Sequence, residues 1–423
     1  MNSDRYNTPR KTLVPRFRKI FSGRLVLLVI LVTLACQAFG QTLTSLYSFG
    51  SAPHDGVFPG SGVAIDAKGN LFGATGVGGR HGSFGTVFEL SHPLVPGGQW
   101  VENILYRFSG TPDGKNPLGR LVMTSTGSLA GTTLNGGVDG SGIVYTLAPG
   151  TQPGTWKKTK LHDFGTVPDD VVTPDLGLFS APEGFYGVDQ GGANGTGAFY
   201  LLTPPASGRG AWTQNILYSF LASGSGDAAG PGGEPIRDAA GNFYGVTALG
   251  GVNNMGAVYE LSPPTVAGGP WTEAVLHSFN GTDGTLPVGP LLLGPGGVLY
   301  GTANGGGDSG EGLVFELDPP TTPGDAWTEN IVHAFGGDGS SPSNGVITDK
   351  RGRLFGTAGG TVFMLTKPRA RGGVWTETIL HSFSVSDGFI INSPITLFKN
   401  ALYGVTAQGG TFGTGMAYKL TLP

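Results

Sequence analysis

Three short sequence blocks recur seven times along the chain and leave no stretch for a domain of another kind. In the first block, a Trp precedes a Phe by eight residues, and the six Trp stand at positions 100, 156, 212, 271, 327 and 375. The second block reads Gly-Asn-Leu-Phe-Gly-Ala-Thr at 69–75, and the third reads Gly-Thr-Val-Phe-Glu-Leu at 85–90. A period of about 55 residues restricts the chain to an array or a ring of similar units.

Composition narrows the choice further. The 423 residues include 77 Gly and 30 Pro, yet 10% are aromatic and only 13% are charged. A disordered chain would not carry so many aromatic residues. The low charge excludes a coiled coil and a nucleic-acid binder with a basic face. Short strands joined by tight turns fit this composition best.

Each repeat contains four strand candidates, which we call A, B, C and D in chain order. In the second repeat they are Leu118–Thr124, Ser128–Thr133, Gly142–Leu147 and Lys157–Phe164. Four strands repeated seven times predict an all-β, seven-bladed β-propeller with four antiparallel strands per blade. The alternative is a β-solenoid or linear array, whose coils are usually shorter. Apolar residues on both faces of Trp327–Phe335 predict a D strand buried on both sides.

The two ends of the repeat region complement each other. A lone D strand, Leu43–Phe49, comes first, and the chain ends with strands A (Ser393–Phe398), B (Ala401–Val405) and C (Met416–Leu420). If the first strand pairs with the last, the seventh blade is complete and the ring is closed. Closure satisfies the edge hydrogen-bonding groups that an open array would leave bare.

Residues 1–40 are predicted to be a signal peptide, followed by one propeller domain over 41–423. Seven bases precede an apolar run from Leu25 to Ala35, and the small residues Ala38 and Gly40 follow it. We expect cleavage after Gly40, or after Ala38, and a secreted, extracellular or periplasmic protein. The alternatives are an uncleaved anchor helix and lipid attachment at Cys36. No membrane span is expected in the mature chain.

The mature chain is acidic, and its acids gather on one face. Without residues 1–40 it has 18 bases, 28 acids and no Cys, so a disulfide is impossible. The D–A and B–C loops share one face of a propeller, and they carry 14 of the 28 acids. The opposite face collects bases such as Lys350 and Arg351. We therefore predict an acidic face that attracts cations or cationic groups.

One Asp per repeat falls in the D–A loop. Four of these residues begin the motif Asp-Gly-x-x-Pro, and the turn interpretation is that each Asp bonds its own backbone. The functional interpretation is a ring of carboxylates that binds a polar ligand or Ca²⁺, although no spacing matches a known calcium loop. We expect no required cofactor, and the sequence does not decide whether the ring binds a metal ion. The candidate ring is Asp55, Asp113, Asp169, Asp227, Asp283, Asp338 and Asp387.

Histidines supply the remaining candidates. Four of them alternate with Tyr at one repeat position, which indicates a packed aromatic with a polar tip; they are His162, His277, His333 and His381. His54, Arg80 and His81 lie on the acidic face beside Asp55 and repeat least regularly. This group is the best candidate for acid–base chemistry, with Asp189 as a further possibility.

The blocks resemble the GloVer tandem repeat of exported bacterial proteins. The clearest matches are Asn70–Leu90, Asn242–Leu261 and Leu299–Leu317. The resemblance covers the mature chain and implies export, but it carries no activity. Many such proteins end in an anchor, whereas this sequence stops three residues after its last strand, so free secretion is expected.

These observations favour a non-catalytic repeat protein that binds an extracellular ligand, glycan or protein through its acidic face. The near-uniform repeat distributes polar groups sevenfold instead of concentrating one catalytic group. A glycan- or peptide-active hydrolase or lyase is the first alternative, and a purely structural surface protein is the second. Nucleic acid is not an expected partner.

Overall fold

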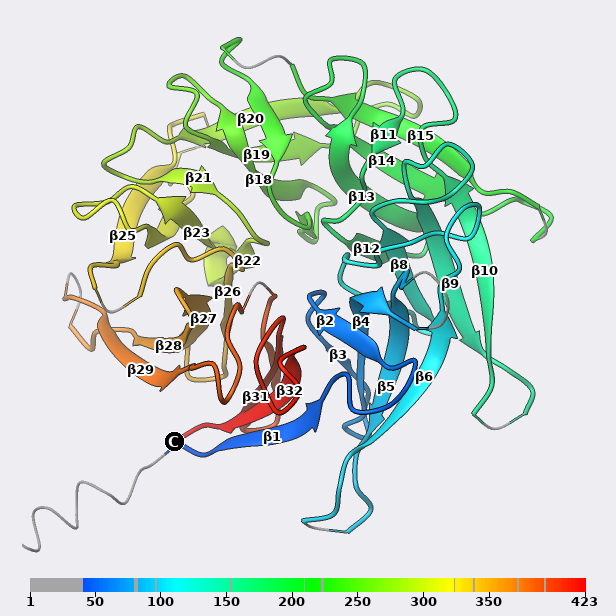
Figure 1. Cartoon of the computed structure of the whole chain (residues 1–423). Coiled ribbons are helices and arrows are strands. Elements are labelled where there is room, and N and C mark those ends of the chain that lie inside the picture. The colour runs from blue at the N-terminus through cyan, green and yellow to red at the C-terminus, as the bar shows by residue number, and fades with distance from the viewer. Residues whose placement is uncertain are drawn as a thin grey trace, which may run out of the picture. The chain divides into compact units, whose positions relative to one another are not determined.

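Seven small antiparallel sheets lie in a ring in the computed structural model (Figure 1). It describes residues 41–423 apart from positions 80–82, 96, 153, 209, 222–223, 323, 338, 371–372 and 392, and its compact β unit spans Thr42–Leu422. The only helical element among these residues is the 3-10 turn η1 (Pro295–Gly297). The chain is therefore an all-β, seven-bladed propeller, as predicted. The predicted signal peptide, residues 1–40, lies outside the described residues.

Strand A lies nearest the axis and is short. Its main segments are β3 (Ala64–Ile65), β7 (Val122–Met123), β12 (Leu178–Ala181), β17 (Ile236–Arg237), β22 (Leu292–Leu293), β26 (Val346–Thr348) and β30 (Thr396–Phe398). Four blades have a further inner segment, which makes five strands where four were predicted: β2 (Gly56–Pro59), β11 (Val171–Val172), β16 (Ala228–Pro231) and β21 (Thr285–Pro287).

The division of strand A has a local cause. In the first blade, Phe58, whose φ is 57°, has no partner in the ladder with β4, and the inner segment β2 ends at Pro59, which has no N–H to donate. In the second blade, Asn116 and Pro117 take these positions, and strand A is limited to Val122–Met123, where the sequence predicted Leu118–Thr124.

The outer three strands of each blade are longer and regular. Strand B is β4 (Leu71–Gly78), β8 (Leu129–Thr133), β13 (Gly184–Gly191), β18 (Phe243–Gly250), β23 (Leu299–Gly305), β27 (Leu354–Ala358) and β31 (Ala401–Thr406). Strand C is β5 (Thr86–Ser91), β9 (Ile143–Pro149), β14 (Ala198–Thr203), β19 (Ala257–Ser262), β24 (Leu313–Asp318), β28 (Thr361–Thr366) and β32 (Met416–Thr421). Strand D is β6 (Val101–Arg107), β10 (Trp156–Asp163), β15 (Thr213–Ser219), β20 (Thr272–Ser278), β25 (Thr328–Ala334), β29 (Thr376–Ser382) and β1 (Leu43–Ser48).

The expectation that strand D is buried on both sides is wrong. Ile331 in β25 is 46% exposed, while the next residue, Val332, is only 5% exposed. Successive residues of a strand face opposite sides of the sheet, so Ile331 lies on the exposed side and Val332 on the buried side. A β-bulge also leaves Val332 out of the pairing between β25 and β24.

The hydrophobic core lies between blades. Each of the seven buried apolar clusters draws its residues from two neighbouring sheets. Trp residues complete these interfaces, as predicted: the Trp327 ring lies tilted against Tyr244 of the preceding blade, with ring centroids 6.5 Å apart. Since no blade has a core of its own, the blades stabilise one another.

The first and last strands close the ring. β1 pairs antiparallel with β32, with Leu43 opposite Leu420 and Ser48 opposite Met416, and the two strands lie side by side in Figure 1. The Phe49 N–H donates to the Gly415 carbonyl at 3.0 Å. The predicted closure is therefore confirmed, and it joins the two ends of the propeller without a covalent bond.

Candidate functional site

The D–A and B–C loops emerge on the same face because successive strands of each blade are antiparallel. Contacts between these loops show this directly. The Phe58 N–H, in the D–A loop that enters the first blade, donates to Thr414 O in the B–C loop of the seventh blade at 2.9 Å. This loop face is where the sequence placed the candidate ring of carboxylates.

The carboxylates of that ring mainly hold their own loops. Asp55 Oδ2 accepts a hydrogen bond from the Ser51 N–H at 2.9 Å and another from the Tyr47 hydroxyl at 3.0 Å. In all six blades where it is described, the loop Asp accepts from a backbone N–H three to six residues earlier, which confirms the turn interpretation. The six are Asp55, Asp113, Asp170, Asp227, Asp283 and Asp387.

The third blade requires a correction. The sequence assigned Asp169 to the ring, but Asp170 accepts from the Thr166 N–H and takes the equivalent position. Asp169 has a φ of 63° and instead corresponds to His54, whose φ is 67°. The adjacent acids made the register ambiguous, because only the backbone conformation distinguishes them.

At several junctions a third polar side chain reaches the loop Asp from the blade that this loop enters. This residue stands two positions after the repeat Trp. It contacts the Tyr or His at the end of the preceding D strand and the Asp of the D–A loop that follows that strand. Between the seventh and first blades this residue is Glu102 of β6, which accepts a hydrogen bond from the Tyr47 hydroxyl of β1 at 3.1 Å. At the fourth blade it is Glu273, which shares the Ala228 N–H with Asp227. The loop Asp therefore lies at a junction between blades.

Three of these junctions bring two carboxyl groups together, with Glu102 beside Asp55, Glu273 beside Asp227 and Glu329 near Asp283. Burial, followed by hydrogen bonding and repulsion from Asp55, raises the pKa of Glu102 to about 9. Burial and Asp227 raise the pKa of Glu273 to about 9 in the same way. Asp55 Oδ1 and Glu102 Oε1 are buried, and no protein N–H or O–H donates to either. A proton on Glu102, whose pKa lies above neutral pH, supplies the missing donor.

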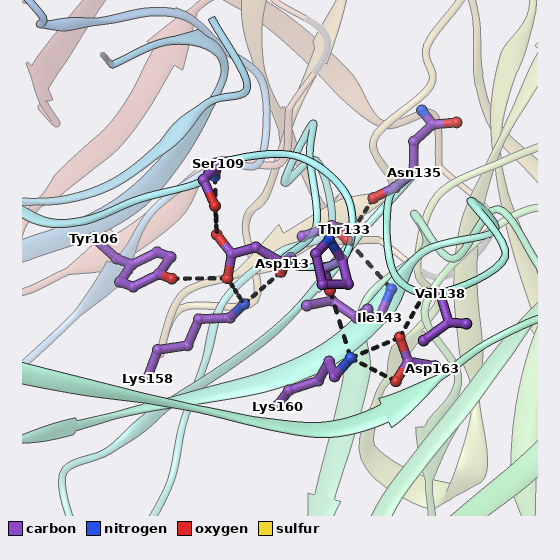
Figure 2. A network of polar contacts seen from close by, with 11 residues as sticks. Tyr106, Ser109, Asp113, Thr133, Asn135, Val138, Ile143, Lys158, Lys160 and Asp163 are labelled. Atoms are coloured by element: carbon purple, nitrogen blue, oxygen red, sulfur yellow. Dashed lines mark hydrogen bonds and ion pairs between the residues drawn. The ribbon is translucent and has the colours of Figure 1, made fainter. Parts of the chain in front are cut away.

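At the junction of the first and second blades, a Lys takes the position that Glu102 and Glu273 occupy, and it forms an ion pair with the loop Asp. Lys158 Nζ bonds Asp113 Oδ1, which also accepts from the Tyr106 hydroxyl at 2.8 Å (Figure 2). Tyr106, Lys158 and neighbouring hydrogen bonds hold the pKa of Asp113 below its usual value despite burial. Beside it, Lys160 pairs with Asp163 at 2.7 Å. The other junctions use Gln214, Glu329, Glu377 and, at β1, the apolar Leu43.

The propeller axis holds a different group of charged residues, which we call the axial cluster: Arg120, Asp175 and Glu234. They line a cavity of 160 Å³, and the side chains of Arg120 and Glu234 are 34% and 18% exposed. Every blade contributes to its wall, with one residue from each being Gly60, Leu118, Asp175, Gly232, Gly289, Ser343 and Pro394.

The axial cluster departs from the repeat. Three residues after the loop Pro, the first, third and sixth blades have Gly62, Gly177 and Gly345, whereas the second and fourth have Arg120 and Glu234. Arg120 Nη1 lies 3.9 Å from Glu234 Oε2. Burial raises the pKa of Glu234 to about 6, against the opposing effect of Arg120. Burial also raises the pKa of Asp175.

Asp189 supports the axial cluster from behind. Its Oδ1 accepts from the backbone N–H groups of Asp175 and Leu176, and its Oδ2 accepts from the Tyr200 hydroxyl at 3.0 Å. The residue is fully buried, and burial raises its pKa well above the usual value. Asp189 therefore positions the loop that carries Asp175 and is not accessible to a substrate.

The remaining predicted residues do not form a described cluster. His54 is exposed on its loop, whereas Asp55 beside it is buried. Arg80, His81 and Asp338 lie outside the described residues, so the proposed acid–base group and the full ring remain predictions. The exchange of His with Tyr is explained by packing: His381 lies edge-on to Phe383 at 4.5 Å and bonds Asp387 at 2.8 Å.

Neither metal ligation nor membrane insertion finds direct support in the described part of the chain. Within it, no three His, Cys, Asp or Glu side chains are placed to hold one metal ion. No helix there has the length and apolar character needed to cross a membrane. Calcium binding by the ring remains an expectation from the sequence.

The fold defines the chain as a seven-bladed β-propeller with polar junctions between blades and a charged axis. The family model of the Gloeobacter/Verrucomicrobia repeat matches residues 33–200, and the same blocks recur to the C-terminus. Residues 33–200 are thus similar to the repeat of that family, and the resemblance predicted from sequence is confirmed there. No curated protein matches it.

Solved structures share the architecture at low identity. The extracellular domain of BT4673 from B. thetaiotaomicron is 13% identical with a TM-score of 0.52, over 89% of this chain and 39% of that one. PorZ, a surface component of the type-IX secretion system of Porphyromonas gingivalis, is 12% identical with a TM-score of 0.51, over 85% and 46%.

An aldose sugar dehydrogenase from Streptomyces coelicolor, bound to PQQ, is 13% identical with a TM-score of 0.45, over 75% and 97%. The present chain thus spans less than half of BT4673's extracellular domain and of PorZ. At such identities the likenesses to BT4673 and PorZ show the fold alone.

Proposed function

We propose that this protein is an exported, non-catalytic propeller that binds a small polar ligand, or a polar group of a larger partner, at the axial cluster. The observation that carries the proposal is the placement of Arg120, Asp175 and Glu234. They are brought together from three blades at the one place where all seven meet.

The repeat itself does not require these charges, because other blades have Gly or Pro at the positions of Arg120 and Glu234. Partly buried charges cost desolvation energy unless they are well paired. A separation of 3.9 Å between Arg120 and Glu234 is a loose pair. A ligand that bonds both groups would offset this cost, which favours binding over a purely structural role.

The cavity limits the size of the ligand. Its 160 Å³ is below the 300–1,000 Å³ of typical drug-sized pockets. The axial cluster combines one cation with two acids. It therefore suits a small molecule, or a protruding group, that carries both an acceptor for Arg120 and a donor or cationic centre for the acids.

The alternative as a hydrolase or lyase receives no support from the described residues. Asp189 is fully buried, and Asp55 is enclosed by Tyr47, Ser51 and Glu102. A general acid or base needs to reach its substrate. Binding is therefore the function that the geometry supports best.

Two screens of the mature protein test the proposal. Thermal shift measures stabilisation by amino acids, amines and sugars, and a glycan array measures binding to larger carbohydrates. Because Arg120 and Glu234 would both contact the ligand, Arg120→Gln and Glu234→Gln should each weaken a confirmed ligand at least about tenfold, or about 1.4 kcal/mol. Arg351→Gln, an exposed residue of the opposite face, is the matched control. Binding that both axial variants retain in full would refute this site.

Export is part of the same proposal and has its own test. Mass spectrometry of protein collected outside the cytoplasm should give a chain that begins at Gln41, or at Phe39 for the second cleavage choice. A secreted chain that keeps residues 1–40 would contradict signal-peptide cleavage.

A further inference from the structure

The sixth blade lacks the B–C loop that the other blades have. β27 ends at Ala358 and β28 begins at Thr361, so only Gly359 and Gly360 connect them. In the fifth blade the corresponding connection runs from Gly305 to Leu313. The deletion is visible in the sequence, because the last Trp spacing is 48 residues where most are 56.

In the other six blades this loop holds the next blade. Its carbonyl accepts a hydrogen bond from the backbone N–H of a residue three positions after the loop Asp. Ser341 donates to Glu311 O at 2.8 Å, and Leu286 donates to Met255 O at 3.0 Å. The remaining pairs are Phe58 with Thr414, Asn116 with Phe84, Thr173 with Ser141 and Gly230 with Thr196. The backbone acceptor is thus a regular part of the junction.

The seventh blade keeps the donor and lacks the acceptor. Ile390 has a φ of 61°, and its counterparts range from 50° in Leu286 to 67° in Gly230. Its carbonyl accepts from the Ala407 N–H, but its own N–H has no bond like those of its six counterparts. Where the others have Pro, this blade has Ile391.

The junction between the sixth and seventh blades is also packed less closely than the other six. In the other six blades, a Cβ on the Gly before strand C would collide with the loop Pro of the next blade, as at Gly312 with Pro342. A Cβ on Gly360 would have no neighbour within 4 Å. The missing loop and the missing Pro therefore leave a gap on the loop face between the sixth and seventh blades.

This gap is a cavity of 390 Å³, within the range of ligand pockets. Phe383, Phe389 and Ile391 give it an apolar wall, and Ser340, Ser341 and Thr357 supply hydroxyl groups. None of the described residues that line it is charged. The cavity combines apolar surface, hydroxyls and one backbone donor.

We propose that this gap binds an extended, uncharged peptide segment of a partner protein, which takes the place of the missing loop. Six junctions of the same propeller fill the equivalent space with Gly-rich backbone, and this indicates peptide as the occupant. A backbone carbonyl of the segment accepts from the Ile390 N–H, and small residues fit beside Gly360. Main-chain bonds provide affinity, and the aromatic wall selects side chains.

The test selects peptides from a randomised library displayed on phage, using the mature protein, and measures synthetic copies by titration calorimetry. The blocking variant replaces Gly359–Gly360 with residues 304–312, the fifth-blade loop, because this should fill the gap from within. Ser340→Phe is a second blocking variant if the graft does not fold. The matched control inserts the same nine residues after Lys350, in the A–B turn on the opposite face.

The selected peptides should bind the wild type and the control alike, and both blocking variants should weaken them at least tenfold. Arg120→Gln should leave peptide binding unchanged, which separates this site from the axial cluster. Equal binding to wild type and both blocked variants would overturn the proposal, as would a library that yields no binder.

Two other outcomes would also assign the gap to a different occupant. Glycan binding that the graft abolishes would replace peptide with carbohydrate. A concentration-dependent dimer, measured by light scattering and abolished by the graft, would replace the partner with a second copy of this chain.

Discussion

At the residue scale, the buried polar groups of this propeller are concentrated at the junctions between blades. One position, two residues after the repeat Trp, is Glu in four blades, Lys158 in the second and Gln214 in the third. Each lies beside a Tyr or His at an equivalent position, and an Asp joins the pair in the blades where the loop Asp is described. The substitutions show that the fold needs a polar partner here and accepts a protonated acid, an amide or an ammonium group.

The junction acids make stability depend on pH. Glu102 and Glu273, each with a pKa of about 9, bind a proton in the folded state and lose it in the unfolded state near pH 4.5. The folded state therefore holds more protons between pH 4.5 and 9, so its stability falls as pH rises through this window. Glu329, with a pKa of about 7, acts in the same direction.

We predict that Glu102→Gln and Glu273→Gln together flatten the decline in the urea midpoint between pH 5 and 9. The double variant should exceed the wild type in stability at pH 9, since Gln214 already fills this position in the third blade. The groups that face Glu102 are Tyr47, Asp55 and Arg107, and both variants leave these three residues unchanged. Asp325→Asn, at an exposed position, should leave the decline unchanged; an equally steep decline in the double variant would contradict this assignment.

At the element scale, strand B approaches the aromatic residue of strand C very closely in every blade. Gly245 in β18 lies against the Tyr259 ring, and a Cβ at this position would overlap the hydroxyl and ring atoms. Gly404 lies against Tyr418 in the same way. Glycine is needed here for space, because each aromatic side chain is fully buried.

Gly245→Ala should therefore destabilise the protein by about 1–3 kcal/mol through overpacking. Gly60→Ala is the matched control, since its Cβ would have only Leu118 nearby, at 3.8 Å. Urea denaturation of both variants measures the difference. Equal midpoints would show that strand C can shift without cost.

At the scale of the whole molecule, the sequence predicted the architecture because the repeat is a local signal. The Trp spacing and the lone strands at the two ends specified seven blades and their closure. It did not predict the junctions, because Tyr47 and Glu102 are 55 positions apart and meet only after blades pack. Asp169 was preferred to Asp170 because their order in the sequence does not reveal which residue has a positive φ.

Two departures from the repeat in the sequence coincide with the two proposed sites. Arg120 and Glu234 are charged residues at a repeat position that is Gly or Pro in the other blades. The short spacing between the last two Trp indicates the missing loop. Both are departures from the repeat, whereas the candidate ring followed the repeat. In a propeller of this kind, regular polar residues maintain the fold and irregular ones indicate a site.

Closure of the ring by β1 and β32 is the central claim, and a cross-link tests it most directly. Thr44 and Lys419 are paired opposite each other, and cross-strand pairs lie within disulfide range. Thr44→Cys with Lys419→Cys, in a Cys36→Ser background, should form an intramolecular disulfide that mass spectrometry locates between these positions. It should stabilise the chain by about 2–4 kcal/mol on oxidation. A Thr44→Cys/Lys157→Cys control should not cross-link within one chain; if the 44–419 pair also gave only intermolecular disulfides, the ring would not be closed as described.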